Sequence, residues 1–198
     1  METKTPGCMM HVLMLALIAL FAMALGTTAR SSTPATGVYQ FAMKNIDGKP
    51  VPLTKYQGKV MMIVNVASLC GNTPQYAKLE ELDKSYRKKG LRILGFPANN
   101  FGSQEPGDEK QIKEFCTSTY HVTFDMFSKI SVKGDDQHPL YKYLTDPSTD
   151  PKFAGDIDWN FAKFIVGRHG EILARFPAHQ DPTSPEVVAA IQSALAQK

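Results

Sequence analysis

The order of apolar and polar positions predicts a series of short strands and helices that begins near Val38. Residues 38–53 alternate apolar and polar side chains around an Asp47-Gly48 turn, which predicts a small β-hairpin. Residues 59–68, KVMMIVNVAS, are apolar almost throughout, as is typical of a central strand covered on both faces. A second short apolar run, residues 91–98, predicts a second strand.

The residues between these two runs predict a helix. Thr73 is the expected N-cap, Pro74 the first helical residue, and Gly90 ends the helix after the basic residues 87–89. One face of the helix is apolar and carries Tyr76, Leu79, Leu82 and Tyr86. Strand, helix and strand at this spacing predict a right-handed parallel crossover.

A second helix is predicted after a loop rich in Gly and Pro. Asp108 and Gln111 have the spacing of a capping box, and Ile112, Phe115 and Cys116 follow at helical spacing. These residues predict a helix with one apolar face.

The last third of the chain predicts a strand pair between two helices. Residues 138–146 predict a short helix, residues 161–176 predict two strands joined at 167–170, and Ser184 begins a closing helix. The whole order predicts an α/β fold of the thioredoxin-like type. Such a fold has a mixed central sheet flanked by helices, here with an N-terminal β-hairpin.

The first thirty residues differ in kind from the rest. A short head carrying Lys4 precedes a continuous apolar run, and the small residues Thr27 and Ala29 follow it, which predicts a secretory signal peptide over residues 1–30. An uncleaved membrane anchor is the alternative, because the run is nearly long enough to span a bilayer. Either interpretation predicts export to a periplasmic or secreted location. Cys8 would leave with the signal, and residues 31–37 are expected to be a linker before a domain over 38–198.

Composition and charge exclude some classes of protein. The 198 residues are 43% hydrophobic, which is enough for one well-packed domain. The 22 basic and 19 acidic residues are spread along the chain and give a net charge of +3, without the basic stripe that nucleic-acid binding needs. The mature chain would hold two cysteines, Cys70 and Cys116, in a compartment where disulfides persist.

Cys70 stands where the first apolar strand ends and the first helix is about to begin. It could be a buried structural thiol, half of a disulfide, or a nucleophile, because catalytic groups in open α/β sheets gather at the carboxyl ends of strands. The positive end of the helix stabilises a thiolate over a thiol. Gly71, Asn72 and Thr73 follow, so no Cys-x-x-Cys pair exists for dithiol exchange or for zinc. A one-cysteine nucleophile on this fold indicates a thiol peroxidase.

Three longer blocks carry a resemblance to a known family. Residues 65–82 (NVASLCGNTPQYAKLEEL), 90–107 (GLRILGFPANNFGSQEPG) and 158–166 (DWNFAKFIV) resemble the glutathione peroxidase family in its cysteine-containing form. The resemblance runs in order from about Val38 to the C-terminus. It implies a peroxidase without metal or cofactor, whose catalytic residues are Cys70, Gln104, Trp159 and Asn160.

These residue types suit the reduction of a peroxide. The amides of Gln104 and Asn160 and the indole N–H of Trp159 are neutral donors, which stabilise charge on sulfur and on the leaving oxygen without burying another charge. Without the resemblance, each has an ordinary alternative: a surface amide, a turn residue and a core aromatic. Ala98 and Asn100 depart from the family pattern, which has Cys and Gln there, so the detail of this loop is open.

Cys116 also has two interpretations. On its own it is a buried core thiol, but the resemblance of the block IKEFCTSTY implies the resolving cysteine of members that use thioredoxin instead of glutathione. Cys70 sulfenic acid would then condense with Cys116. The rival is a non-catalytic exported module in which the two cysteines form a structural or redox-sensing disulfide. A peroxiredoxin-like enzyme fits less well, because it requires an activating Arg and a Thr or Ser three residues before the cysteine. Here the three residues before Cys70 are Ala67, Ser68 and Leu69, so Ala67 occupies that position.

The resemblance extends to substrates and partners. It implies hydrogen peroxide and organic or lipid hydroperoxides as substrates, with a thioredoxin-like protein or glutathione as reductant. The stretch between Cys116 and Trp159 is short, as it is in the monomeric members of the family, which implies a monomer. The basic segment KSYRKKG, residues 84–90, would suit a transient contact with an anionic membrane or would simply complement the helix dipole.

Overall fold

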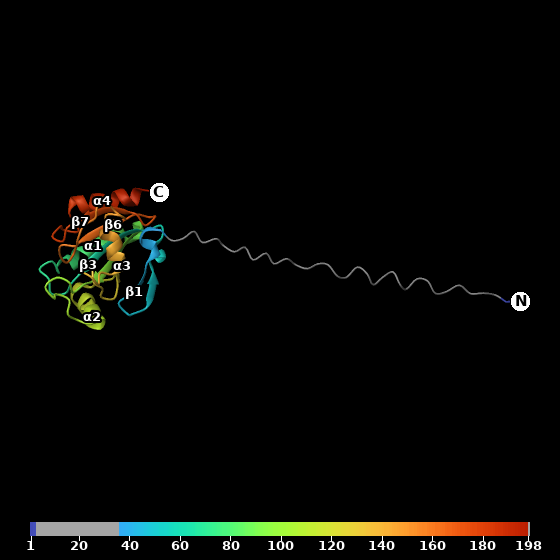
Figure 1. Cartoon of the computed structure of the whole chain (residues 1–198), viewed down its shortest axis with the longest axis horizontal. Coiled ribbons are helices and arrows are strands. Elements are labelled where there is room, and N and C mark those ends of the chain that lie inside the picture. The colour runs from blue at the N-terminus through green and yellow to red at the C-terminus, as the bar shows by residue number, and fades with distance from the viewer. Residues whose placement is uncertain (3–35, 198) are drawn as a thin grey trace. The chain divides into compact units, whose positions relative to one another are not determined.

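The computed structural model describes residues 1–2 and 36–197 (Figure 1). Most of the predicted signal segment, with Cys8 and most of the linker, lies outside these residues. Within the described part, no helix is both long enough and apolar enough to cross a bilayer. Residues 36–197 belong to one unit of the chain, and the elements below all lie in it.

A five-stranded mixed sheet forms the centre of this unit, in the order β5-β4-β3-β6-β7. The strand β3 (Val60–Val66) pairs in parallel with β4 (Leu91–Pro97) and antiparallel with β6 (Lys163–Val166). The outer strands are β5 (Asp125–Met126), parallel to β4, and β7 (Ile172–Phe176), antiparallel to β6. This is the mixed sheet that the sequence predicts.

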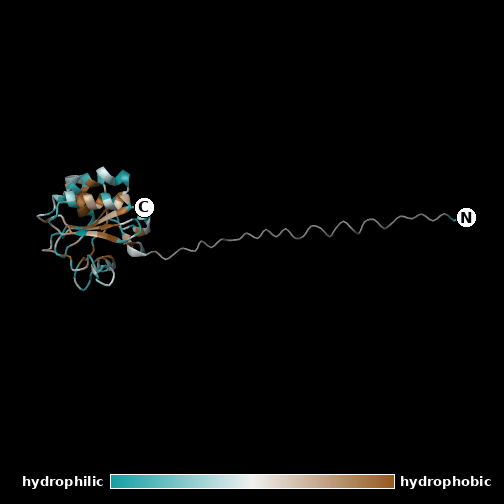
Figure 2. Cartoon of the chain, turned by 90° about the horizontal axis from the view of Figure 1, so that it is seen from above, coloured by the Kyte–Doolittle hydropathy of each residue, from teal (hydrophilic) through white to brown (hydrophobic). Residues whose placement is uncertain are grey.

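The sheet is covered on both faces because β3 alternates its side chains between two buried clusters. Val60, Met62 and Val64 belong to one cluster, which includes apolar residues of α1 (Gln75–Tyr86), α2 (Glu109–Tyr120) and α4 (Pro185–Ala196). Met61 and Ile63 belong to the other, which includes the hairpin and α3 (Pro139–Thr145). Figure 2 shows the hydrophobic strands as a layer between the helices. A strand buried on both faces explains the almost unbroken apolar run.

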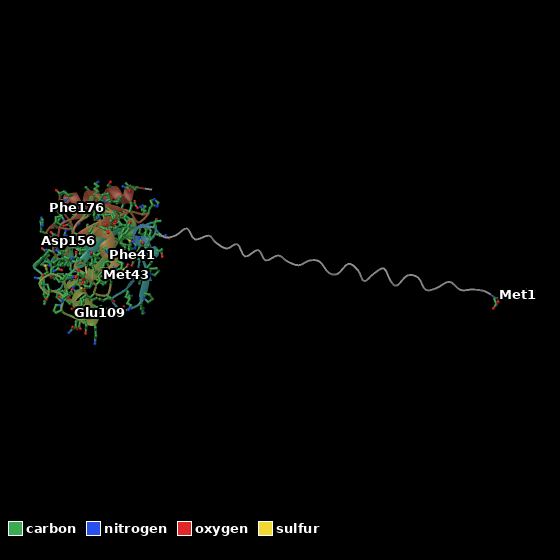
Figure 3. The ribbon with its side chains drawn as sticks, viewed as in Figure 1. Met1, Phe41, Met43, Glu109, Asp156 and Phe176 are labelled. Atoms are coloured by element: carbon green, nitrogen blue, oxygen red, sulfur yellow. The ribbon has the colours of Figure 1, made fainter. Side chains whose placement is uncertain are left out.

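The predicted hairpin is present as a separate two-stranded sheet. Its strands β1 (Ala42–Lys44) and β2 (Pro50–Pro52) are antiparallel, with Ala42 opposite Pro52. Gly48 in the turn has a φ of +75°, a left-handed conformation that glycine adopts without strain. Phe41 and Met43, labelled in Figure 3, project from this part of the chain, and Met43 is buried.

One predicted helix start is wrong, and another is confirmed in position but lacks its side-chain bond. Thr73 is not an N-cap, because the helix begins at Gln75 and the Thr73 hydroxyl bonds back toward the end of β3. Ser184 occupies the N-cap position of α4, but its side chain makes no capping hydrogen bond. Asp108 and Gln111, in contrast, form the predicted capping box at α2. The short strand β5 was not predicted, since two residues are too few to show a period.

The basic segment after α1 has partners within the chain. Lys84 pairs with Glu80, and Arg87 donates from Nε to Asp83 at 2.6 Å. Glu80 and Asp83 are buried, so these pairs satisfy carboxylates that would otherwise lack a counter-charge. Lys89 lies over the Tyr86 ring. These contacts favour the structural interpretation of this segment over a membrane contact.

We expect Asp108→Ala to destabilise the protein by about 1 kcal/mol, because the side chain accepts the Gln111 N–H at 2.8 Å at the start of α2. Ser184→Ala is the matched control, since Ser184 makes no capping bond, and it should cost only a few tenths of that. Urea unfolding measures both changes. Equal losses for the two variants would contradict the importance of the capping box.

Candidate active site

Cys70 lies in a tight turn between β3 and α1. Its side chain is almost buried, and its Sγ accepts a hydrogen bond from the Asn72 backbone N–H at 3.3 Å. An N–H directed at sulfur stabilises negative charge there. The turn residues 71–74 also place the thiol before the first turn of α1, whose unpaired N–H groups are the positive end of the helix.

Thr73 fixes the shape of this turn. Its Oγ1 accepts from the Cys70 N–H at 3.0 Å and donates to the Ala67 carbonyl at 2.9 Å. The Thr73 N–H donates in turn to the Cys70 carbonyl at 3.0 Å. The hydroxyl that the sequence assigns to the helix cap therefore orients the backbone of the cysteine instead.

Gln104 and Asn160 meet beside this turn. Asn160 Nδ2 donates to Gln104 Oε1 at 3.0 Å, and the Asn160 side chain is fully buried. The Leu69 N–H donates to the Gln104 carbonyl at 3.0 Å, and Asn72 Nδ2 donates to the Asn160 carbonyl at 3.3 Å. These bonds tie two segments that are distant in sequence, those of Gln104 and Asn160, to Leu69 and Asn72 on either side of Cys70.

Trp159 and Asn160 are held in place by Asn65 on β3. Asn65 Nδ2 donates to the Trp159 carbonyl at 3.1 Å, and the Phe161 N–H donates to the Asn65 carbonyl at 2.6 Å. Phe161 has a φ of 75°, an unfavourable conformation for a residue with a large side chain. The two bonds from Asn65 hold the chain in this conformation at the site.

The structure thus brings Cys70, Gln104, Trp159 and Asn160 to one place, as the resemblance implies. Within the described residues, however, the hydrogen bond to the sulfur comes from Asn72, while Gln104 and Asn160 bond to each other. Sequence reasoning missed Asn65 and the roles of Asn72 and Thr73. Asn65 leaves one sign in the sequence, as a polar residue within the apolar run of β3.

The surface around Cys70 is unusually apolar. Leu69 is 64% exposed and Trp159 is 41% exposed, and apart from Met1 they are the large hydrophobic residues exposed in the described part of the chain. The Trp159 ring lies 5.6 Å from the ring of Phe101, which supports it from below. Two exposed apolar side chains thus belong to the segments that form the site.

A buried lysine, also not predicted, anchors the loop after β7. Lys163 Nζ donates to the carbonyls of Pro177, Ala178 and Gln180. Burial lowers the pKa of its ammonium to about 7, although nearby aspartates oppose this shift. Gln75, at the start of α1, donates to the same Ala178 carbonyl. The loop therefore joins β6 to the helix that follows Cys70.

Cys116 lies in the interior of α2 and is fully buried. Burial raises the pKa of its thiol to about 11; the nearby Tyr76 hydroxyl acts in the opposite direction, and the Glu105 carboxyl adds to the rise. Cys70 and Cys116 are both free and belong to the same buried cluster. The permanent structural disulfide of the rival interpretation is therefore not present, and Cys116 has the environment of an unreactive thiol.

The described residues hold no group of three or more His, Cys, Asp or Glu side chains that could bind a metal ion.

A strand-end thiol on a thioredoxin-like sheet, in a turn bonded to the segments that carry Gln104 and Asn160, is typical of thiol-dependent peroxidases. The profile of the family described as "Glutathione peroxidase" matches residues 38–145. The chain belongs to the glutathione peroxidase family, and it is a peroxidase.

Two relatives and two solved structures place the chain more closely. It is 43% identical to the thioredoxin/glutathione peroxidase BtuE of Escherichia coli over 173 residues, covering 78% of this chain and 94% of the relative. It is 44% identical to a hydroperoxy fatty acid reductase of Synechocystis over 163 residues, covering 80% and 95%. The crystal structure of Trgpx in apo form is similar, with a TM-score of 0.66, 35% identity and coverage of 82% and 97%. A thioredoxin family protein from Chlorobium tepidum, at 14% identity, a TM-score of 0.59 and coverage of 83% and 99%, shows the fold alone.

We expect Asn160→Ala to slow the oxidation of Cys70 by peroxide about tenfold to a hundredfold, because Gln104 loses the bond that orients its amide. Asn100→Ala is the matched control. Asn100 Nδ2 donates to Ser131 and Lys133, so this change leaves the bond between Asn160 and Gln104 intact. Pre-steady-state kinetics with hydrogen peroxide measures both rates. Equal rates for Asn160→Ala and wild type would contradict the role of this bond.

Proposed function

We propose that the protein reduces hydrogen peroxide and organic or lipid hydroperoxides through a sulfenic acid on Cys70. The Cys70 thiolate attacks one peroxide oxygen, the O–O bond breaks, and an S–O bond forms. The second oxygen leaves with a proton as water or an alcohol, and sulfur is oxidised by two electrons. The observation that carries this proposal is the Asn72 N–H directed at a nearly buried sulfur, in a turn that is bonded to the segments of Gln104 and Asn160.

Gln104, Trp159 and Asn160 are assigned supporting roles in this step. The bond from Asn160 occupies the oxygen of the Gln104 amide, which leaves the Nε2 hydrogens of Gln104 as its donors. The Trp159 indole adds one N–H at the exposed side of the site. These donors stabilise the oxygen that departs with developing negative charge.

Cys116 is proposed to resolve the sulfenic acid. Its thiol attacks the sulfur of Cys70, an S–S bond forms, the S–O bond breaks, and water leaves with the thiol proton. A disulfide requires Cα atoms within about 7 Å. Because Cys116 is buried in the middle of α2, this helix must open locally before the attack. A thioredoxin-like dithiol would then reduce the disulfide and become oxidised itself.

A thioredoxin-like donor is favoured by the second cysteine and by the relative from Escherichia coli, whose name includes thioredoxin. Glutathione is the other candidate reductant. Lipid hydroperoxides are favoured by the exposed Leu69 and Trp159 beside the thiol, and by the similar hydroperoxy fatty acid reductase.

Export and oligomeric state belong to the same proposal. The apolar run near the N-terminus supports a signal peptide or membrane anchor, and hence a periplasmic or secreted protein that draws its reductant across the membrane. The short stretch between Cys116 and Trp159 supports a monomer. The alternative function is a redox-sensing module that passes oxidation to a partner protein. It uses the same Cys70–Cys116 disulfide but would not turn over peroxide with either a thioredoxin-like donor or glutathione.

We expect Cys70→Ser to abolish peroxide turnover with every reductant, because it removes the nucleophile. Cys116→Ser should still be oxidised once by one equivalent of peroxide but should lose turnover with a thioredoxin-like donor. Peroxide consumption with a thioredoxin system and with glutathione measures this difference. If glutathione supports turnover and no thioredoxin-like donor does, the proposed reductant is wrong. If Cys70 is oxidised but neither reductant supports turnover, the redox-sensing module is favoured.

A further inference from the structure

Glu105 is a buried acid for which the peroxidase step has no use. Its residue is 1% exposed, and its Oε2 makes no hydrogen bond of good geometry within the described part of the chain, although Ser68 lies near enough to lower the pKa of the carboxyl. Burying a carboxyl without satisfying both oxygens costs free energy. Buried acids of this kind often take part in proton transfer.

The position of Glu105 is between the segments that carry the two cysteines. It lines a cavity of about 410 Å³ whose other walls are Ser68 and Leu69, just before Cys70, and residues of α2 on the side of Cys116: Gln111, Ile112 and Phe115. Glu109, labelled in Figure 3, marks the start of this helix. The cavity leaves room for part of α2 to move toward the Cys70 turn.

Charged and titratable groups face Glu105 from every element around it. Ser68 and Lys129 lower the pKa of its carboxyl, but burial outweighs them and raises it above the usual value. Lys129 Nζ itself donates to the carbonyls of Glu105 and Gly107. On the other side, the carboxyl acts on the pKa of both Tyr76 and Cys116, so it lies within electrostatic reach of the resolving thiol.

The chemistry of resolution needs a base and then an acid at this place. The Cys116 thiol is nearly all protonated at neutral pH, because its pKa is about 11. Its proton must leave before sulfur attacks, and the oxygen that leaves Cys70 must gain a proton to become water. One carboxyl on the wall of the cavity next to the Cys70 turn, within electrostatic reach of Cys116, can perform both transfers and return to its starting state.

We propose that Glu105 carries the proton of the resolving step, an inference that rests on the proposed role of Cys116. The Glu105 carboxylate takes the proton of the Cys116 thiol as α2 opens into the cavity. The thiolate attacks the sulfur of Cys70 sulfenic acid, the S–S bond forms and the S–O bond breaks. The departing hydroxide takes the proton from Glu105 and leaves as water, so no further reductant is consumed.

The test uses Glu105→Gln in the full chain. The variant should fold, because a neutral amide of the same shape relieves the cost of burying a charge. For an acid with a raised pKa in the folded state, this cost applies above the pKa of the unfolded state and is therefore present at pH 7. Glu114→Gln is the matched control, since Glu114 is an exposed acid on α2, the helix that carries Cys116.

The readouts are the sulfenic acid, trapped with a carbon nucleophile, and the Cys70–Cys116 disulfide, both followed by mass spectrometry after one equivalent of peroxide. Glu105→Gln should form the sulfenic acid at the wild-type rate but form the disulfide about a hundredfold more slowly. Glu114→Gln should match the wild type in both steps. Glu105→Asp should recover part of the rate, because it keeps a carboxylate.

The pH profile separates proton transfer from a structural role. The wild-type rate of disulfide formation should rise as Glu105 ionises and then become level. In Glu105→Gln it should rise about tenfold per pH unit toward the pKa of Cys116, because only pre-formed thiolate can attack. Equal rates of disulfide formation and equal pH profiles in the wild type and Glu105→Gln would overturn the role of Glu105 but leave resolution by Cys116 intact. If the wild type forms no Cys70–Cys116 disulfide, the proposed resolution by Cys116 fails, and the role of Glu105 fails with it.

Discussion

The hydrogen bonds of Asn65 connect the fold to the site. Asn65 lies in the central strand β3, where its neighbours are apolar, and it binds the chain on both sides of Asn160 through Trp159 and Phe161. Because β3 is buried on both faces by the two clusters, Asn65 has a fixed position. The same strand ends in the Cys70 turn. One rigid strand therefore sets the thiol and its neighbouring donors relative to each other, as catalytic pre-organisation requires.

The two cysteine thiols have opposite environments in the structure. Cys70 receives an N–H at its sulfur and lies at the beginning of a helix, whereas Cys116 is inside a helix and burial raises the pKa of its thiol. This difference suits a cycle in which one thiol meets peroxide first and the other acts only after a local opening. It also protects Cys116 from direct oxidation, because a buried thiol without thiolate character reacts slowly.

Much of the fold could be predicted from the sequence because its strands and helices are regular and strongly amphipathic. The run at β3, the capping box at Asp108 and the turn at Gly48 each have a local physical signature. The site was harder to predict. Cys70 is marked by its place after a strand, but Gln104, Trp159 and Asn160 were found through family resemblance.

The remaining features depend on contacts between distant residues. Thr73 has the spacing of a helix cap, yet its hydroxyl is used by Cys70 and Ala67, which no local pattern reveals. Asn65 and Glu105 gain their importance from partners far along the chain. Lys163 looks like an ordinary polar residue at the start of a strand, but three carbonyls from one loop surround it.

The most direct test of the central claim is stopped-flow fluorescence of Trp159, the one tryptophan of the chain, after mixing reduced protein with hydrogen peroxide or a lipid hydroperoxide. The account predicts a fast change whose rate increases with peroxide concentration and which is absent in Cys70→Ser. A fast change that persists in Cys70→Ser, or no fast change with either peroxide, would contradict the assignment of Cys70 as the peroxide-reducing thiol.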